Sequence, residues 1–152
     1  MNIIFKKLEP NEISMCAETL ISAFREDPWN EEWTFEQAHV RLEELMSAKV
    51  SRGFIVLDMD TKTVVGMVIG RIMTYVSNKE LWLDEVSVHP DYQRKGIGTR
   101  MFEYVKQELQ QEDSSIRNIV LTTMRGYPSV SFYENIGFRM DENVIFMEGT
   151  VK

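Results

Sequence analysis

The chain of 152 residues carries a formal net charge of -7, with 43% hydrophobic and 27% charged residues. This length suits one domain with its own core, and the composition excludes an intrinsically disordered chain. The acidic balance argues against a nucleic-acid partner, because binding to a phosphate backbone needs a basic face. No apolar run reaches the roughly 20 residues of a membrane span, so we expect no membrane partner.

The first ten residues, MNIIFKKLEP, lack the basic, apolar and small-residue zones of a signal peptide. We therefore expect a cytoplasmic protein. Cys16 is the only cysteine, and together with two scattered histidines it does not complete a four-ligand Cys/His zinc site. We accordingly expect no metal.

Apolar spacing predicts a strand and two helices in the first third of the chain. Residues 2–9 read as a short strand, and Asn11 stands before a helical pattern that Pro28 ends. Thr34 and Gln37 have the spacing of a capping box, which predicts the start of a second helix.

Two β-branched runs, GFIVLDMD and TVVGMVIGRIMTYV, flank the polar residues 60–62 and predict a hairpin. Asn78 and Lys79 predict another turn before LWLDEVSVH, residues 81–89. In that strand the two leucines share one alternation phase and the two later valines share the other, so the pattern slips at Asp84 and Glu85. A β-bulge explains the slip, and a strand buried on both faces is the alternative.

The remaining pattern predicts alternating helices and strands. A helix begins near Gly98, and residues 118–123 form a short buried strand. A last helix runs from Pro128 to Asn135 with Gly137 as its left-handed C-terminal residue, and residues 144–150 form a final strand.

The stretch HPDYQRKGIGTRM, residues 89–101, joins a strand to a helix through a glycine-containing turn. Such a turn binds anions, because the first N–H groups of the helix lack partners and the helix dipole is positive there. Gly96 and Gly98 let the backbone approach a phosphate, and three cations stand nearby: Arg94, Lys95 and Arg100. A Walker loop and a dinucleotide fingerprint are both excluded, since Ser or Thr does not follow Lys95 and Met101 replaces the third glycine.

Three linked motifs resemble the GNAT superfamily of N-acetyltransferases. QRKGIG (93–98) matches its Gln/Arg-x-x-Gly-x-Gly/Ala loop, VSVHP (86–90) is similar to its cofactor strand, and FYENIGF (132–138) is similar to its closing signature. The chain departs from the pattern at Gly126, where many members carry an Asn. The resemblance implies one domain over 1–152 and a mixed α+β fold. It also implies a mostly antiparallel twisted sheet of six or seven strands, splayed at the fourth, with about four helices.

The resemblance further implies acetyl-CoA as the co-substrate. Backbone of Val86, Ser87 and Val88 would pair with the pantetheine arm, as in strand addition. The pyrophosphate would lie in the loop, whose implied cofactor-binding residues are Gln93, Arg94, Lys95, Gly96, Ile97, Gly98 and Thr99.

Acyl transfer to an amine needs a base for the ammonium proton and an acid for the leaving thiolate. The resemblance gives Tyr133 the acid role, and a packing role for its ring is the alternative. Glu85 beside the expected bulge is our candidate base, with a solvated or ion-paired strand residue as the alternative. His89 has suitable chemistry, but its place before Pro90 favours a role in the turn.

An unpaired backbone N–H at the bulge, near Val86, is the expected donor to the oxyanion. Cys16 lies in a helical pattern, so we interpret it as a core residue rather than an acyl carrier.

The connection REDPWNEEW, residues 25–33, is the expected source of acceptor contacts, together with Asp84. Its four carboxylates would attract a cation, and its two tryptophans would cover it through a cation–π contact. These residues are Glu26, Asp27, Glu31 and Glu32, with Trp29 and Trp33. Alternatively, these carboxylates complement a helix N-terminus and the tryptophans of the connection anchor it to the core.

Three functions remain open at this point. The first is acetyl transfer to a small polar amine of polyamine, amino-sugar or aminoglycoside type. The second is a protein acetyltransferase acting on a lysine or an N-terminal amine, and the third is a non-catalytic acyl-CoA-binding module. A small-molecule amine is thus the expected partner, and a homodimer is compatible with the family resemblance.

Overall fold

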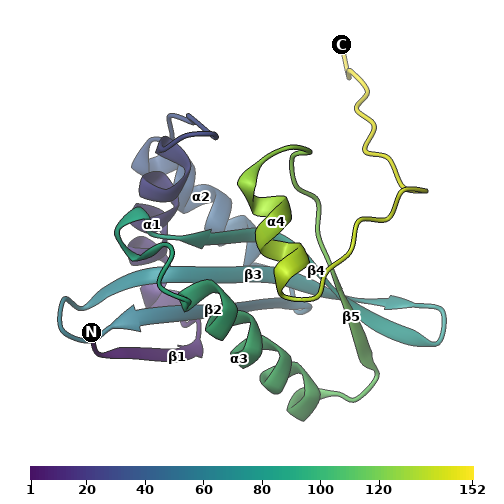
Figure 1. Cartoon of the computed structure of the whole chain (residues 1–152), viewed down its shortest axis with the longest axis horizontal. Helices are drawn as coiled ribbons and strands as arrows, with labels where there is room; N and C mark the ends of the chain where they lie inside the picture. Colours follow the sequence, from purple (N-terminus) through teal and green to yellow (C-terminus); the bar gives the residue numbers. More distant parts are fainter. The chain divides into compact units, whose positions relative to one another are not determined.

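The structure is a computed structural model that describes residues 1–152, in two compact units, Met1–Val120 and Leu121–Lys152 (Figure 1). The first unit contains a five-stranded sheet, three α-helices and two short 3-10 helices. The second contains one helix. In chain order the elements are β1 (Ile3–Lys7), η1 (Pro10–Glu12), α1 (Ile13–Arg25), α2 (Phe35–Leu45), β2 (Ser51–Asp58), β3 (Thr63–Tyr75), β4 (Asn78–Val88), η2 (Pro90–Tyr92), α3 (Ile97–Glu112), β5 (Ile116–Val120) and α4 (Pro128–Asn135).

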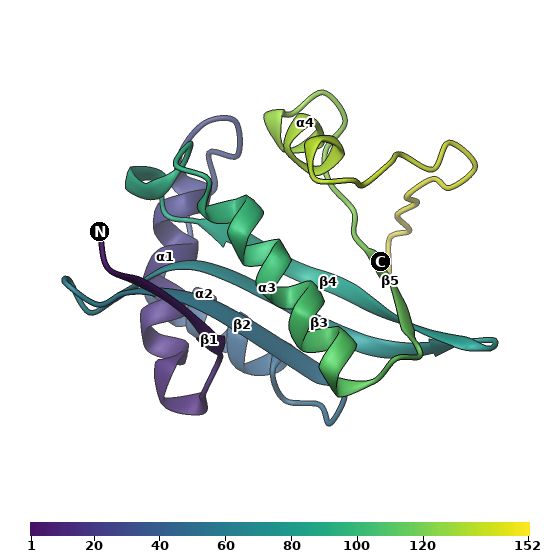
Figure 2. The ribbon, with the colours of Figure 1, turned by 60° about the horizontal axis from the view of Figure 1, so that its bottom comes forward.

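The strands follow one another across the sheet in the order of the sequence, β1-β2-β3-β4-β5. The first four are antiparallel neighbours, and β5 runs parallel to β4 after the crossover through α3. Figure 2 shows α3 on one face of the sheet and α1 and α2 on the other. The predicted mixed α+β fold with a mostly antiparallel sheet is confirmed, with five strands instead of six or seven.

Local signals in the sequence account for several element boundaries. The Thr34 hydroxyl accepts a hydrogen bond from the Gln37 N–H at 3.1 Å, and the Gln37 side chain accepts one from the Thr34 N–H at 3.0 Å, which confirms the capping box. Pro128 begins α4, and Gly137 just beyond it has a φ of 104°, in the left-handed region.

Most of the buried apolar side chains on the α1 and α2 face form one core cluster. Its members are Ile13, Cys16, Ala17, Leu20, Ala38, Leu42, Ile55, Val64, Met67 and Ile69. The Thr19 hydroxyl donates to the Val64 carbonyl oxygen at 2.6 Å, so the one polar side chain of α1 in this layer is satisfied by the sheet. Packing on this face fixes α1 and α2 against β3, close to the candidate site.

The opposite face of the sheet is covered by the apolar stripe of α3. Met101, Phe102 and Val105 are buried there, and the Tyr104 ring contacts the Phe54 ring at 6.1 Å between centroids. This packing places the N-terminus of α3 beyond the end of β4.

The structure differs from the sequence-based prediction at three places. Val76 and Ser77 form the turn before β4, two residues earlier than expected, and β5 begins at Ile116 instead of 118. Residues 144–150, predicted as a final strand, contain no helix or strand. That prediction was wrong because a strand needs a neighbour for its backbone groups, and β-branched residues alone do not supply one.

No helix in the structure combines the length and apolar character needed to span a bilayer.

Candidate active site

A β-bulge interrupts β4, as the slipped alternation predicted. Ile69 pairs with Glu85 and Gly70 pairs with Leu83, so Asp84 has no partner on β3. Gly70 makes the bulge possible, because a Cβ at this position would lie 2.4 Å from the Trp82 carbonyl oxygen. The bulge reverses which face of the sheet each later side chain occupies.

Beyond the bulge, β4 has an unpaired edge. Its pairing with β5 runs from Lys79 to Trp82 and then stops, while its pairing with β3 continues to Val88. Edges of this kind present N–H and C=O groups that can pair with another extended chain.

The hydrogen-bond alternation along β3 and β4 identifies the groups on that edge. The His89 N–H donates to the Val65 carbonyl oxygen at 2.8 Å, and such pairs recur every second residue, which directs the backbone of Ser87 toward β3. The backbone groups of Val86 and Val88 therefore face away from β3. Gln93 Nε2 donates to the Val88 carbonyl oxygen at 2.9 Å, so this carbonyl is already paired with the loop.

The loop after β4 presents an uncapped helix terminus. Gly96 is the N-cap of α3 in a left-handed conformation with φ 78°, and no side chain caps the helix. The N–H groups of the first turn, from Ile97 to Thr99, consequently have no intrahelical partners. Arg94 also has a positive φ of 61°, which is uncommon for a residue with a side chain.

Aromatic rings accompany two cations of this loop. The Lys95 ammonium lies 5.7 Å from the Tyr92 ring centroid, and the Arg100 guanidinium lies 5.1 Å from that of Phe5. His89 Nδ1 accepts a hydrogen bond from the Asp91 N–H at 3.1 Å, which confirms the interpretation of His89 as a turn residue.

Glu85 points to the face of the sheet that α1 and α2 cover. It is 8% exposed, and Arg41 Nε of α2 donates to its Oε2 at 2.8 Å. Burial raises the pKa of the Glu85 carboxyl, and the neighbouring guanidinium opposes that rise without cancelling it. A buried carboxylate with a raised pKa is a suitable proton acceptor, although Arg41 holds one of its oxygens.

Asp84 is engaged differently. Its two carboxylate oxygens accept hydrogen bonds from Arg71 Nε at 2.8 Å and Nη2 at 2.9 Å. This two-point pair occupies the carboxylate that was expected to contact the acceptor.

A hollow of about 440 Å³ runs along α2 and is lined in part by Arg41, the partner of Glu85. Its lining residues are Trp33, Glu36, Gln37, Val40, Arg41 and Glu44. The Trp33 indole N–H donates to Glu31 Oε1 at 2.8 Å, and the Arg41 Cζ lies 6.0 Å from the Trp33 ring centroid. Because Arg41 both lines the hollow and contacts Glu85, its side chain lies between the two.

The rest of the α1–α2 connection supports the loop itself. The Glu26 carbonyl oxygen accepts hydrogen bonds from the N–H groups of Trp29 and Asn30 at 3.0 and 3.1 Å. The Trp29 ring packs edge-on against Phe24 with centroids 5.4 Å apart. Trp29 thus anchors this segment to α1, and Asp27 lies in the same turn.

Cys16 is fully buried, and burial raises the pKa of its thiol to about 12. Such a thiol is almost wholly protonated at neutral pH and is a poor nucleophile. The interpretation of Cys16 as a core residue is confirmed.

Tyr133 belongs to α4 in the second compact unit. Its ring contacts those of Phe132 and Phe138 with centroids 5.2 and 5.5 Å apart, and its carbonyl oxygen accepts the Phe138 N–H at 2.9 Å. The FYENIGF motif therefore forms one local aromatic cluster.

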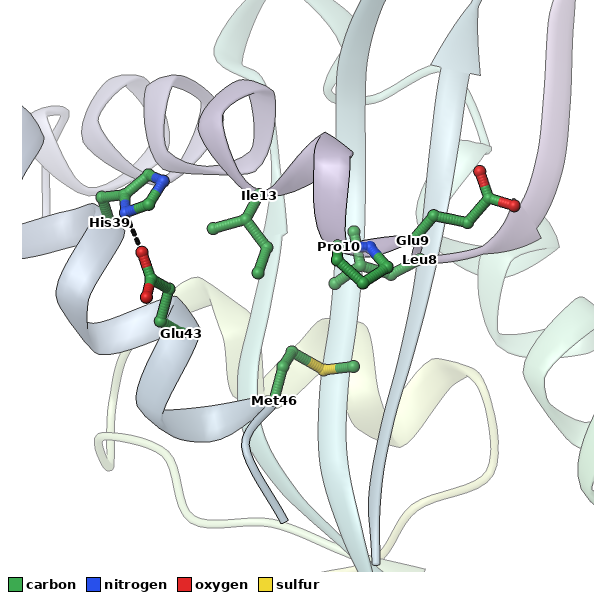
Figure 3. Close-up of a pocket in the computed structure, with 7 residues that line it drawn as sticks. All are labelled: Leu8, Glu9, Pro10, Ile13, His39, Glu43 and Met46. Atoms are coloured by element: carbon green, nitrogen blue, oxygen red, sulfur yellow. Dashed lines mark ion pairs between the residues drawn. The ribbon is translucent and has the colours of Figure 1, made fainter. Parts of the chain in front are cut away.

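A separate pocket of about 360 Å³ lies between η1, α1 and α2 (Figure 3). Its lining residues are Leu8, Glu9, Pro10, Ile13, His39, Glu43 and Met46, and His39 Nδ1 lies 2.6 Å from Glu43 Oε1. None of these residues belongs to β4 or to the loop after it, so the pocket is distinct from the candidate site.

The sequence profile of the Acetyltransferase (GNAT) family matches residues 16–138. The chain belongs to this acetyltransferase family. No curated protein matches this GNAT protein significantly in sequence.

Solved structures resemble this GNAT protein in fold at low sequence identity. A possible acetyltransferase from Clostridium difficile 630 is 15% identical, with all of both chains covered and a TM-score of 0.81. An aminoglycoside acetyltransferase from an uncultured soil metagenomic sample, in complex with sisomicin, is 15% identical over 99% of this chain and 97% of its own, with a TM-score of 0.76. The complex of AAC(6')-Iy with a CoA-containing bisubstrate analog is 17% identical over 99% of each chain, with a TM-score of 0.74.

Sequence patterns alone missed several residues of the site in this GNAT protein, among them Arg41. A signal was present, because Arg41 is the only Lys or Arg in the acidic segment 26–48. A lone cation among carboxylates suggests an ion pair, but nothing in the local pattern names a partner 44 residues away.

Proposed function

We propose that the chain is an N-acetyltransferase that transfers the acetyl group of acetyl-CoA directly to a primary amine of a small polar or cationic molecule. One observation carries the proposal. In a member of the GNAT family, β4 has an unpaired edge at Val86 and Val88, and an uncapped helix terminus follows it in the chain. A strand edge suits an extended amide-containing arm, and a helix N-terminus suits a pyrophosphate.

The residues present fit the two parts of CoA. The N–H of Val88 and both backbone groups of Val86 are free of β3. The Val88 N–H and the Val86 carbonyl would pair with the pantetheine arm, which leaves the Val86 N–H for the acetyl group. The backbone N–H groups from Lys95 to Thr99 would hold the pyrophosphate, with Gly96 in the conformation that turns the chain into α3. Gln93 supports this arrangement by fixing the Val88 carbonyl to the loop.

Bound acetyl-CoA would supply an activated acetyl group as a thioester. Glu85 would accept the proton of the attacking ammonium, for which its burial and raised pKa are suitable. The Val86 N–H would donate to the developing oxyanion. The Tyr133 hydroxyl would protonate the leaving sulfur, a role supported by its motif.

Charge near Glu85 favours a cationic acceptor. Glu36 and Glu44 line the hollow beside α2, and Glu31 orients Trp33 at the same hollow. Carboxylates and an aromatic face attract ammonium groups. The sisomicin complex of a fold neighbour supports an aminoglycoside or similar polyamine as a candidate.

The proposal treats residues 1–152 as one functional domain, since the family match from 16 to 138 extends over both compact units. We expect acetyl-CoA to raise the melting temperature of the full chain, because a ligand that binds only the folded state stabilises it. ATP and NADH, which lack the pantetheine arm, serve as controls. Equal shifts with all three ligands would remove the cofactor assignment.

The decisive assay measures CoA release with a panel of amines. The panel contains a diamine, an amino sugar, an aminoglycoside and a lysine-containing peptide. Release above spontaneous hydrolysis with the small amines supports the proposal. Release with the peptide alone would replace it with protein acetylation, and no release with any amine would leave only CoA binding. Tyr133→Phe should lower turnover with little change in acetyl-CoA affinity.

A further inference from the structure

The guanidinium of Arg41 is surrounded by groups that would bind a free cation. Its Nε donates to Glu85 Oε2 at 2.8 Å, and its Nη2 donates to the Asp84 carbonyl oxygen at 3.3 Å. The Trp33 ring lies 6.0 Å from its Cζ. A buried carboxylate, a backbone carbonyl and an aromatic face together are typical of an ammonium or guanidinium site.

Further negative charge reinforces this surrounding. The Glu31 carboxylate fixes the Trp33 indole at 2.8 Å, and it is close enough to Glu85 to contribute to the raised pKa of that carboxyl. Glu36 and Glu44 line the adjoining hollow. A small cation in the hollow would therefore be attracted toward Glu85, where it would meet Arg41 first.

The Arg41 side chain can leave this position without unfolding its helix. It extends from α2 and is 39% exposed, whereas Glu85 is held in the sheet and is 8% exposed. Among the side-chain hydrogen bonds of the structure, Glu85 accepts only the one from Arg41. An arginine that swings into the hollow would be solvated there, and Glu85 would then face the hollow.

We propose that Arg41 is an internal occupant of the acceptor's cation subsite, and that a cationic amine binds by displacing its guanidinium from Glu85. This inference rests on the proposed function and deepens it. Displacement favours acceptors with two or more charges, because one cation replaces Arg41 on Glu85 while a second pairs with Glu36 or Glu44. A neutral or singly charged amine gains less from the same exchange.

The test measures cation binding in the absence of acetyl-CoA. Methylguanidinium and the diamine putrescine are titrated calorimetrically into the wild-type protein, Arg41→Gln and Arg52→Gln at mildly alkaline pH. Arg52 is a matched control, because it also pairs with a glutamate, Glu112 at 2.8 Å, and its removal changes the net charge equally. If Arg41 fills the subsite about nine-tenths of the time, its removal should lower the apparent Kd about tenfold.

The expected result is tighter binding of both probes to Arg41→Gln alone. The double variant Arg41→Gln/Glu85→Gln should lose that gain. Binding to Arg41→Gln no tighter than to Arg52→Gln would overturn the proposal, and so would a double variant that binds as tightly as Arg41→Gln.

A measurement on the wild-type protein keeps the proposal testable if Arg41→Gln does not fold. The NMR signal of the Arg41 Nε–H should move toward that of a solvated arginine as putrescine is added. A signal that stays in place throughout the titration would overturn the proposal. A wild-type protein that shows the predicted displacement of Arg41 by cations but does not bind acetyl-CoA would count against the proposed function alone. One that binds acetyl-CoA but shows no displacement of Arg41 would count against the subsite alone.

Discussion

The two halves of β4 have different neighbours. Asn78–Trp82 pairs with β3 and, from Lys79, with β5, whereas Leu83–Val88 pairs with β3 only. The bulge at Asp84 lies close to the boundary, one residue inside the second half. A site can therefore be made within one strand by ending its pairing on one side, while its pairing on the other side continues.

The halves also differ in what they bury. The paired half buries only the apolar Leu81, while the open half buries the polar residues Glu85 and Ser87 in addition to Leu83. Ser87 Oγ has no hydrogen-bond partner in the protein. An unpartnered buried hydroxyl costs about 1–3 kcal/mol, so the open half gives up stability that the paired half keeps.

The largest expected effect on stability comes from proline substitutions in the open half, where one N–H faces β3 and the next faces the unpaired edge. Ser87→Pro removes an N–H that the alternation directs to β3, and we expect a loss of about 3 kcal/mol in the free energy of unfolding. Val86→Pro removes an N–H on the open edge, so its loss in the free energy of unfolding should be smaller than that of Ser87→Pro by at least about 1 kcal/mol. The same variant should bind acetyl-CoA more weakly. Urea denaturation measures both losses. Equal losses would show that the two edges are not different.

Glu85→Gln should lower turnover about a hundredfold, because a general base contributes at least that factor. Acetyl-CoA affinity should be unchanged, since Glu85 lies on the face of α1 and α2 and not on the open edge. Glu112→Gln is the control, as it breaks another glutamate–arginine pair with the same 2.8 Å distance, away from β4. Steady-state kinetics with the best amine would refute the role of Glu85 if the variant kept a third of its turnover.

Gly70→Ala tests the bulge at Asp84, close to the boundary between the halves. Its Cβ would meet backbone, the Trp82 carbonyl oxygen at 2.4 Å, and we expect a loss of about 2–3 kcal/mol in the free energy of unfolding. Gly66→Ala on the same strand would meet only side chains at close range, Met101 Sδ at 3.2 Å and Val56 Cγ2 at 3.3 Å, and should cost about 1 kcal/mol. A Gly70→Ala protein as stable as the Gly66→Ala protein would show that the bulge tolerates a side chain.

The smallest expected effect is on the pH dependence of stability, which should have opposite signs for the contributions of Glu85 and Glu112. The pKa of Glu85 is raised by burial in the folded protein, so its stabilising contribution is complete below its unfolded pKa and is lost as the pH rises through its folded pKa. The pKa of Glu112 is lowered by its hydrogen bond with Arg52, so its contribution is present above its unfolded pKa and is lost as the pH falls through its folded pKa.

Unfolding free energies across the acidic to neutral range check this difference. Relative to Glu85→Gln, the wild type should lose stability as the pH rises. Relative to Glu112→Gln, it should gain stability over the same range. The same slope for both comparisons would contradict the burial of Glu85.

Short-range interactions determined much of this protein from the sequence alone. The capping box at Thr34, the left-handed Gly137 and the slip that marks the bulge each depend on residues only a few positions apart. Three linked motifs, at 86–90, 93–98 and 132–138, also gave the resemblance to the GNAT family, which the family match over residues 16–138 confirms.

The tertiary structure decided the remaining features, because they depend on segments far apart in the chain. Only the assembled sheet turned Glu85 toward α2 and Asp84 toward Arg71, and only the packing of α2 brought Arg41 to a carboxylate 44 residues away. Residues 144–146, two β-branched and one aromatic, have high strand propensity but form no strand, because no neighbouring strand pairs with them. Local patterns fix what the backbone can do, but which side chains meet depends on which strands and helices pack together.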